Sequence, residues 1–455
     1  MASKLPPALI RSLIEQYHIE DEAFIATHTN GEQLTSIRLN PFKPVNAFPN
    51  AELMPWCEHG RYLVTRPSFT ADPLFHAGSY YVQEASSMFL EQVLKNTLDL
   101  SEDLKVLDLC AAPGGKSTLI SSLLSKNSLL LANEIIKTRV PVLCDNLNKW
   151  GPQNTFVSSN DPKDFKRLEG YFDVILVDAP CSGSGMFRKD PAAIDEWSEA
   201  AVLLCSQRQK RILADVVESL KQNGTLIYST CSYSKQENED ISDWLCETFD
   251  LENIRIPIED SWGIVETESD QHKCYGYRFY PHKVKGEGFF IAAFTKKSIS
   301  AIPQIRRAKE NNVNAKSEEI IKKWLIESPE IREINLNEEF FAIPAKLEAD
   351  LQYLQSRLYL KKSGVRIGKI MGKDLVPNHE LAASLLNNPN THRINLSHDQ
   401  SISYLKREEL KLELAYKGWA LMCFEDYPLG WAKILDNRLN NYFPKEIRIT
   451  NPNVV

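Results

Sequence analysis

Between residues 104 and 296 the chain alternates short apolar runs with longer amphipathic stretches. The apolar runs span residues 104–110, 129–134, 172–180, 224–232 and 288–294, a length typical of buried strands. Between them lie segments with apolar residues at helical spacing, and the longest, 199–222, is followed by a stop signal at Gly224. Strands that alternate with helices predict an α/β fold with a doubly wound parallel sheet. Such sheets bind ligands beyond the carboxyl ends of their strands.

The two flanks differ from this central pattern. Residues 1–85 open with a helical stretch and continue into a proline-rich segment, which predicts a small N-terminal domain. We assign residues 86–297 to the α/β domain, 298–335 to a polar linker and 336–455 to a C-terminal region. Strand-like runs within 418–435 indicate a small β-rich module near the end of the chain.

Composition narrows the class of protein. The sequence has no apolar stretch of about eighteen residues, and its start lacks the apolar core of a secretion signal. We therefore expect a soluble, cytoplasmic protein with no membrane partner. The nine cysteines are scattered and form no CxxC pair, which argues against a disulfide framework or a zinc site, so we expect no metal.

Charge is distributed unevenly along the chain. The net charge of −7 argues against a protein that holds nucleic acid by bulk electrostatics. However, the stretch 357–373 carries several basic side chains and no acidic one, with Lys361, Lys362 and Arg366 near its centre. It is a candidate patch for RNA phosphates, and a solvated basic surface is an equally good interpretation of the charge alone.

A glycine-rich turn follows the first apolar run, in the motif DLCAAPGGKST from Asp108 to Thr118. Gly114 and Gly115 let the backbone approach a ligand closely, and the next helix offers free N–H groups. A phosphate-binding P-loop is excluded because Cys110 stands where its first glycine is required, and a GxGxxG dinucleotide pattern is also missing. The turn remains suited to the amino-acid end of S-adenosylmethionine, with Glu134 placed to bond ribose hydroxyls.

Two cysteine motifs end other apolar runs: DAPCSGSGMFRKDP begins at Asp178, and STCS spans residues 229–232. C5 of cytosine is a poor nucleophile, but a thiolate added at C6 makes it able to attack a sulfonium methyl group. This chemistry needs a thiolate, a group at N3 and a base, roles that Cys231, Asp178 and Cys181 could fill from neighbouring strand ends. A single buried cysteine is usually inert, so the hypothesis depends on the pair together with the cofactor turn.

Together with YPHKVKGEGFF at 280–290, these motifs resemble the Nol/Nop/Sun family of RNA cytosine-5 methyltransferases over about residues 78–296. The resemblance implies a class I methyltransferase fold, S-adenosylmethionine as cofactor, Cys231 as nucleophile and Cys181 as the residue that assists product release. It also places Arg188 and Lys189 near the RNA. The cofactor contacts that it implies are Cys110, Ala111, Ala112, Pro113, Gly114, Gly115, Lys116, Glu134, Asp161 and Asp178.

The flanks are similar to those of the bacterial RsmF-type branch of this family, which has an N-terminal domain and a PUA-like C-terminal module. That likeness implies small-subunit ribosomal RNA, or the assembling subunit, as the partner. Residues 300–400 match the branch only loosely. We expect a monomer.

Three alternatives remain open. In DNA cytosine-5 methyltransferases the cysteine of the PC motif attacks the base, which would make Cys181 the nucleophile. A methyltransferase with a protein or small-molecule target would explain the cofactor turn but not the paired cysteines. An inactive RNA-binding or ribosome-assembly factor would explain the fold, yet it has no physical reason to retain Cys231, Cys181 and Asp178 together.

Overall fold

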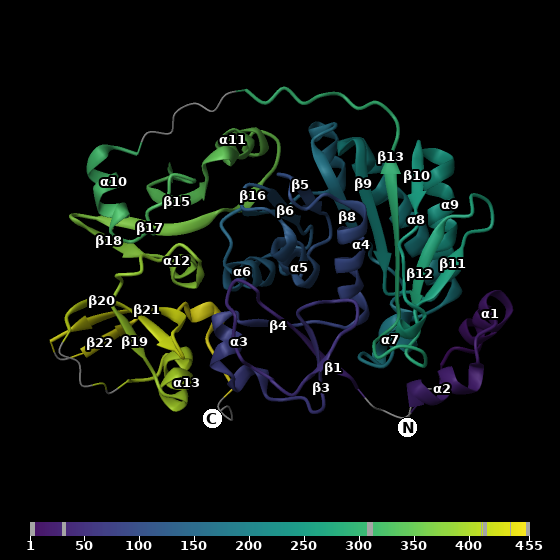
Figure 1. Cartoon of the computed structure of the whole chain (residues 1–455), viewed down its shortest axis with the longest axis horizontal. Helices are drawn as coiled ribbons and strands as arrows, with labels where there is room; N and C mark the ends of the chain where they lie inside the picture. The colour runs from purple at the N-terminus through teal and green to yellow at the C-terminus, as the bar shows by residue number, and fades with distance from the viewer. Residues whose placement is uncertain are drawn as a thin grey trace.

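The alternating region forms the central sheet of the computed structural model (Figure 1). The structure describes residues 5–29, 33–306, 313–410, 412, 416–436 and 438–451. Within those ranges the central sheet has ten strands in the order β11-β12-β13-β9-β8-β5-β6-β7-β16, with β10 paired to β13. Its strands are β5 (Lys105–Asp108), β6 (Leu129–Asn133), β7 (Thr155–Ser158), β8 (Phe172–Asp178), β9 (Leu220–Thr230), β10 (Leu251–Ile254), β11 (Val265–Glu268), β12 (Tyr275–Phe279), β13 (Phe289–Lys296) and β16 (Leu360–Ser363).

The predicted α/β fold is confirmed, with two corrections. Strands β5 to β9 pair in parallel, but the last apolar run forms β13, which is antiparallel to β9. The long amphipathic helix α8 (Glu199–Val216) ends before Gly224, because β9 already begins at Leu220, which pairs with Phe172 of β8. Pairing with a neighbouring strand therefore overrides the helical pattern of residues 217–222.

Helices cover both faces of the sheet. Adjacent residues of a strand point to opposite faces, and on β5 Val106 and Leu107 belong to two different apolar cores. The core around Leu107 includes side chains of α8, and the core around Val106 includes side chains of α5. The helices of this domain are α4 (Leu90–Thr97), α5 (Gly115–Leu123), α6 (Val140–Trp150), α7 (Ala192–Glu196), α8 and α9 (Glu239–Thr248).

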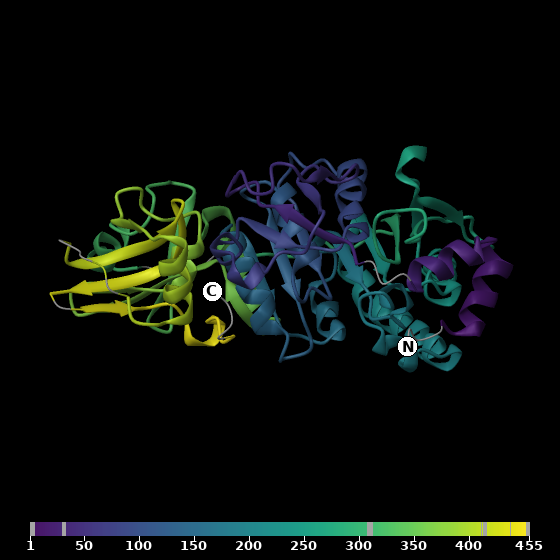
Figure 2. The same cartoon turned by 90° about the horizontal axis from the view of Figure 1, so that it is seen from below.

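The N-terminal domain consists of a helical pair and a small antiparallel sheet. Helices α1 (Pro7–Tyr17) and α2 (Asp21–Thr29) lie at one end of the elongated molecule (Figure 2). The sheet has the strand order β2 (Glu52–Leu53), β3 (Gly60–Leu63), β1 (Thr35–Leu39), β4 (Tyr80–Val82), and α3 (Pro73–Ala77) precedes β4. From β1 the buried Arg38 reaches the α/β domain, where it donates to Thr118 Oγ1 over 2.6 Å and stacks on Trp150.

One buried lysine joins three parts of the chain. Lys43 Nζ donates to the carbonyl oxygens of Ala77, Lys149 and Ala383 at 2.8, 2.6 and 2.7 Å. These carbonyls lie in the last turns of α3, α6 and α12 (His379–Ala383), where a cation is favoured by the helix dipole. The N-terminal domain, the α/β domain and the C-terminal region are therefore bonded at one point.

The C-terminal region contains more structure than its sequence suggested. The segment 298–335, expected to be a linker that runs into a helix, contains a helix, α10 (Ala315–Lys322), and also the start of β14, which was not expected. In the described part of the region, two four-stranded sheets lie at the end of the molecule opposite α1 (Figure 2). The first sheet consists of β14 (Ile331–Leu336), β15 (Glu339–Pro344), β17 (Val365–Met371) and β18 (Asp374–Pro377). The second consists of β19 (Arg393–Asn395), β20 (Gly418–Phe424), β21 (Tyr427–Leu435) and β22 (Arg438–Asn441). The region also contains helices α11 (Glu348–Gln355) and α13 (His398–Lys406). Strand β16 lies between β15 and β17 along the chain but not in their sheet. β15 pairs with β17, and β16 pairs with β7 of the central sheet.

Among the described helices, none combines the length and apolar character that crossing a membrane requires.

Candidate active site

A cavity of about 370 Å³ opens at the carboxyl ends of β5, β8 and β9. This is the edge at which parallel α/β sheets bind ligands. Its walls come from the turn after β5, from the loops after β8 and β9, and from β4 of the N-terminal domain with the loop that follows it. The lining residues are Tyr81, Val82, Gln83, Glu84, Ser87, Asp108, Cys110, Ala111, Ala112, Pro113, Gly115, Lys116, Asp178, Ala179, Met186, Cys231, Gly288 and Phe289.

The glycine-rich turn has the geometry that its sequence predicted. Gly114 has a φ of +113°, a backbone conformation that other residues adopt only with strain, and α5 starts directly after it. A Cβ added at Gly115 would stand 3.4 Å from a ring carbon of Tyr81 across the cavity. The turn therefore brings backbone close to the ligand space, with the N-terminus of α5 behind it.

Asp108 supplies an unused acceptor in this cavity. Its Oδ2 accepts a hydrogen bond of 2.6 Å from Ser117 Oγ, while its buried Oδ1 has no partner among the described residues. Burial raises the pKa of Asp108 to about 7. An ammonium group bound beside Oδ1 would satisfy the orphan oxygen and favour the ionised carboxylate. The cavity thus fits the amino-acid end of S-adenosylmethionine, and Asp108 is a candidate contact for it that the sequence did not indicate.

Lys116 and Asp178 form an ion pair on the cavity wall. Lys116 Nζ lies 2.7 Å from Asp178 Oδ2, and Ser229 Oγ donates to Asp178 Oδ1 over 2.8 Å. Burial alone would lower the pKa of Lys116, but the neighbouring carboxylates Asp178 and Asp108 raise it overall. Asp178 is therefore oriented from two sides, with its carboxylate directed into the space between the cofactor turn and the cysteine loops.

The two predicted cysteines are brought together. The register of β8 and β9 pairs Asp178 with Ser229, so the loops that carry Cys181 and Cys231 run side by side. The Sγ atoms of Cys181 and Cys231 lie 3.1 Å apart. The hydrogen bond with Cys231 and burial raise the pKa of Cys181 well above its usual range. Among the described residues that line the cavity, Cys231 is included and Cys181 is not.

Three predicted cofactor residues, Gly114, Glu134 and Asp161, are not among the residues that line this cavity. Glu134 follows β6, where it accepts from Ile136 N over 2.8 Å and pairs with Arg139 at 3.2 Å. Its charge is close enough to contribute to the raised pKa of Asp108, which is caused mainly by burial. Asp161 follows β7 and accepts from Lys163 N over 3.1 Å as a helix cap. Glu134 and Asp161 lie at the predicted edge of the sheet, and their contacts to ribose and adenine stay predictions.

The predicted RNA contacts are partly contradicted. The amine of Lys362 is buried and is bonded to Gly364 O and, at 3.4 Å, to Glu380, so it cannot reach a phosphate. The Lys362 prediction was wrong because a charge pattern does not reveal burial. The Arg188 side chain is only 6% exposed and lies 3.8 Å from Glu287. Its position near the RNA, which the family resemblance implied, stays a prediction.

The remaining basic candidates keep accessible side chains. Lys189 and Lys361 are exposed. The Arg366 side chain is 34% exposed, and its guanidinium forms ion pairs with the carboxylates of Glu339 and Glu380 at 3.5 and 3.8 Å. Lys361 is thus the best placed of the predicted phosphate contacts in the C-terminal region.

Sequence reasoning also missed the contribution of the N-terminal domain. Tyr81, Gln83 and Glu84 line the cavity from β4 and the loop after it. They lie in the stretch at which the family resemblance begins, and only that resemblance could have singled them out. The described residues contain no group of three or more His, Cys, Asp or Glu side chains that could hold a metal ion.

Three family profiles match successive parts of the chain. "N-terminal domain of 16S rRNA methyltransferase RsmF" matches residues 5–85, "16S rRNA methyltransferase RsmB/F" matches 95–295, and "Methyltransferase RsmF PUA domain" matches 391–449. A protein of Shewanella sediminis (strain HAW-EB3) named ribosomal RNA small subunit methyltransferase F is 30% identical over 416 residues, which cover 87% of this chain and 84% of that protein. This chain belongs to the RsmB/F methyltransferase family.

Other relatives agree with this assignment. A protein of the same name from Aliivibrio fischeri (strain MJ11) is 28% identical and covers 97% of both chains. The crystal structure of a methyltransferase homologue from Pyrococcus horikoshii has a TM-score of 0.53 and 27% identity, covering 64% of this chain and all of that one. NSun6 from Pyrococcus horikoshii, solved with SFG, shares the fold at a TM-score of 0.54 and 19% identity over 66% of this chain and 100% of its own. As an RsmB/F methyltransferase, this protein uses S-adenosylmethionine as its cofactor.

The raised pKa of Asp108 predicts that cofactor affinity depends on pH. Below about pH 7 the carboxyl of Asp108 is protonated in the free protein, so binding a cationic ammonium beside it requires release of that proton. S-adenosylmethionine affinity should therefore rise with pH, by up to about tenfold per pH unit, and level off above the pKa. Calorimetric titrations between about pH 6 and 8.5 measure this slope.

Asp108→Asn should flatten the slope and weaken binding at high pH by about 1.5–3 kcal/mol, the range for hydrogen bonds to charged groups. Asp145→Asn is the matched control, because burial also raises the pKa of Asp145, to about 6, but its side chain does not line the cavity. If the dependence of affinity on pH is unchanged in Asp108→Asn, Asp108 does not contact the cofactor.

Proposed function

We propose that this methyltransferase transfers a methyl group from S-adenosylmethionine to C5 of a cytosine in small-subunit ribosomal RNA, through a transient bond between Cys231 Sγ and C6. The observation that carries the proposal is the position of Cys231, which faces the cofactor cavity while its sulfur contacts Cys181. The choice of RNA is supported by relatives that carry the name of small-subunit ribosomal RNA methyltransferases over nearly the whole chain.

Each side chain has a role in the proposed reaction. The Cys231 thiolate adds to C6, and the electron pair of the C5–C6 double bond then forms a bond from C5 to the methyl group that the cofactor supplies, while the methyl–sulfur bond breaks and its electron pair stays on sulfur. A base next removes the C5 proton, its electrons restore the double bond, and the sulfur leaves C6. We assign to Asp178, held by Lys116 and Ser229, the contact with the cytosine ring. Cys181 touches the sulfur that must leave, which suits a role in product release.

The preference for Cys231 over Cys181 as nucleophile has a geometric basis. Cys231 lines the cavity, whereas Cys181, whose sulfur lies 3.1 Å from that of Cys231, is not among the lining residues. Attack by Cys181, as in DNA cytosine-5 methyltransferases, would come from a sulfur that does not line the cavity. We therefore assign attack to Cys231 and release to Cys181.

Transfer of labelled methyl groups tests the function. The purified protein is incubated with labelled S-adenosylmethionine and either naked small-subunit ribosomal RNA or isolated small subunits, and the RNA is digested to nucleosides. We expect label in 5-methylcytidine. Label in protein, or in a different nucleoside, would contradict the proposal. The target base must leave its stack to reach the cavity, so a loop or a loosened helix should be the better substrate.

The exposed Lys361 allows a sharper test of RNA binding than the whole basic stretch. If Lys361 neutralises one phosphate, Lys361→Ala should reduce the slope of log affinity against log salt by about 0.7–0.9. Lys362→Met is the control one residue away, and because its amine is buried the slope should not change. Filter-binding titrations at several salt concentrations measure both. An unchanged slope in Lys361→Ala would make this stretch an ordinary solvated surface.

A further inference from the structure

We propose that Glu237 is the positioning residue for the two cysteines: its carboxylate ties the loop after Cys181 to the loop after Cys231 and so fixes the distance between the two sulfurs. The inference rests on the proposed function, because it concerns the same reaction. It goes beyond that function in naming a residue outside the motifs that led to it.

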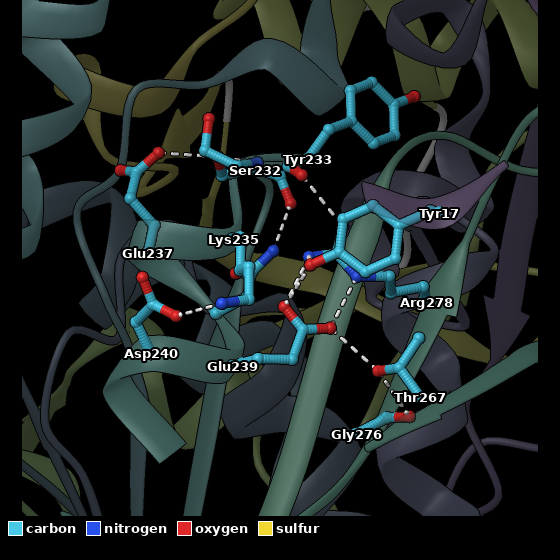
Figure 3. A network of polar contacts seen from close by, with 12 residues as sticks. Tyr17, Ser232, Tyr233, Lys235, Glu237, Glu239, Asp240, Thr267, Gly276 and Arg278 are labelled. Atoms are coloured by element: carbon cyan, nitrogen blue, oxygen red, sulfur yellow. Dashed lines mark hydrogen bonds and ion pairs between the residues drawn. The ribbon is translucent and has the colours of Figure 1, made fainter. Parts of the chain in front are cut away.

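The contacts of Glu237 reach both loops. Ser182, which follows Cys181, donates to Glu237 from its backbone N at 2.8 Å and from its Oγ at 2.6 Å. Ser232, which follows Cys231, donates from its Oγ at 2.5 Å. Figure 3 shows the Glu237 carboxylate directed at Ser232. One carboxylate therefore holds the residue next to each cysteine.

Gln209 and Asn238 complete the support on either side. From α8, Gln209 Nε2 donates to Pro180 O over 3.0 Å and to Glu237 over 3.3 Å, so the PC loop is held before and after its cysteine. Asn238 accepts from Thr230 Oγ1 at 2.6 Å and donates to Ser232 O at 2.8 Å. These two contacts bracket Cys231 in the same way. The sulfurs are thus placed by a network that does not touch the substrate space.

A carboxylate is the group that this position requires. Each contact on Glu237 comes from a neutral donor, an N–H, a hydroxyl or an amide, and an ionised carboxylate offers acceptors alone. The side chain is fully buried, and burial raises its pKa while the hydrogen bonds from Ser182 and Ser232 oppose that shift. A buried carboxylate held by neutral donors is costly, and this one lies where it joins the loops that carry the two cysteines.

The charge of Glu237 also distinguishes the two thiols. The raised pKa of Cys181 is caused first by its hydrogen bond with Cys231 and by burial, and the charge of Glu237 adds to it. A neutral Cys181 thiol can donate a hydrogen bond to the Cys231 sulfur as that sulfur leaves C6 with the electron pair of the C–S bond. Glu237 therefore supports the division of roles between attack and release.

The test compares three variants with one control. Glu237→Gln keeps the size of the side chain but presents an NH2 group to donors. Ser232→Ala removes the contact between Glu237 and the loop of Cys231. Ser182→Ala removes the hydroxyl contact with the loop of Cys181, and the backbone N–H of residue 182 still donates to Glu237. Asp240→Asn, the control, alters a carboxylate three residues away that pairs with Lys235 at 2.9 Å. For each variant we measure kcat, the KM for S-adenosylmethionine, and the fraction of enzyme covalently bound to RNA during turnover.

Glu237→Gln should lower kcat by roughly ten- to a hundredfold, as expected when reacting groups shift by about 1 Å, with KM for the cofactor changed less than about twofold. Ser182→Ala should increase the covalently bound fraction, because release is impaired. Ser232→Ala should decrease it, because attack is impaired. Asp240→Asn should behave as the wild type. A role in stability alone would not move the bound fraction in opposite directions.

A wild-type kcat in Glu237→Gln, or equal shifts in the two serine variants, would overturn the inference. If Glu237→Gln does not fold, the opposite shifts of Ser182→Ala and Ser232→Ala decide the question. Failure of the proposed function is a separate result, because the wild-type protein itself would then form no 5-methylcytidine.

Discussion

Cys231→Ala is expected to abolish RNA methylation and to form no covalent RNA adduct, whereas Cys181→Ala should form the adduct and release it poorly. The reason is position, because Cys231 lines the cofactor cavity and Cys181, 3.1 Å away between the sulfurs, is not among the lining residues. Removing a nucleophile removes the whole covalent route, so the loss in kcat should be at least roughly a thousandfold. Denaturing gel electrophoresis of enzyme mixed with RNA and S-adenosylmethionine detects the adduct.

Cys205→Ala provides the control for this experiment. Cys205 lies on α8, near enough for Cys231 to influence its pKa, which is raised mainly by burial, but it does not line the cavity. Its replacement should leave methylation and the adduct unchanged. The reverse pattern, with an adduct in Cys231→Ala and none in Cys181→Ala, would assign the attack to Cys181 as in the DNA enzymes.

The site was predictable where its chemistry is local in sequence. The apolar runs became β5, β6, β8, β9 and β13, and the motifs stand directly after strands whose pairing brings them to one edge. Gly114 and the two cysteines could be selected because backbone freedom and thiol chemistry belong to the residue type itself. The parallel direction of the inner strands was predictable from the alternation of strands and helices along the chain.

What the sequence hid depends on distant contacts. Nothing local indicates that β16 joins the edge of the central sheet, or that β4 lines the cofactor cavity. Glu237 resembles any charged residue near a helix start until Ser182 and Ser232 are seen to converge on it. Lys362 shows the opposite error, because a basic residue in a basic stretch is buried against Glu380. Burial and convergence are tertiary properties, and patterns of neighbouring residues do not contain them.

Arg278→Met is expected to destabilise the protein by about 3–5 kcal/mol, because it leaves the buried carboxylate of Glu239 without its cation. Arg278 donates to the two carboxylate oxygens of Glu239 at 2.7 and 2.5 Å, and both side chains are at most 2% exposed (Figure 3). Tyr17 at the end of α1 also donates to Glu239, over 2.8 Å, and packs under the guanidinium. The pair therefore anchors the N-terminal helices to the α/β domain. Denaturant unfolding of the full chain measures the loss.

Two further variants separate the ion pair from packing. Tyr17→Phe keeps the ring under Arg278 and removes a hydroxyl that donates to Glu239 and accepts from Arg278, so it should cost about 1.5–3 kcal/mol. The double variant Arg278→Met with Glu239→Gln removes both charges and should be more stable than Arg278→Met alone. Because Arg278 also donates to Tyr233 O at 2.8 Å, two residues after Cys231, its loss should lower kcat as well as stability. An unchanged free energy of unfolding in Arg278→Met would contradict this prediction. It would mean that water solvates Glu239 once Arg278 is gone and that apolar contacts hold α1 to the sheet.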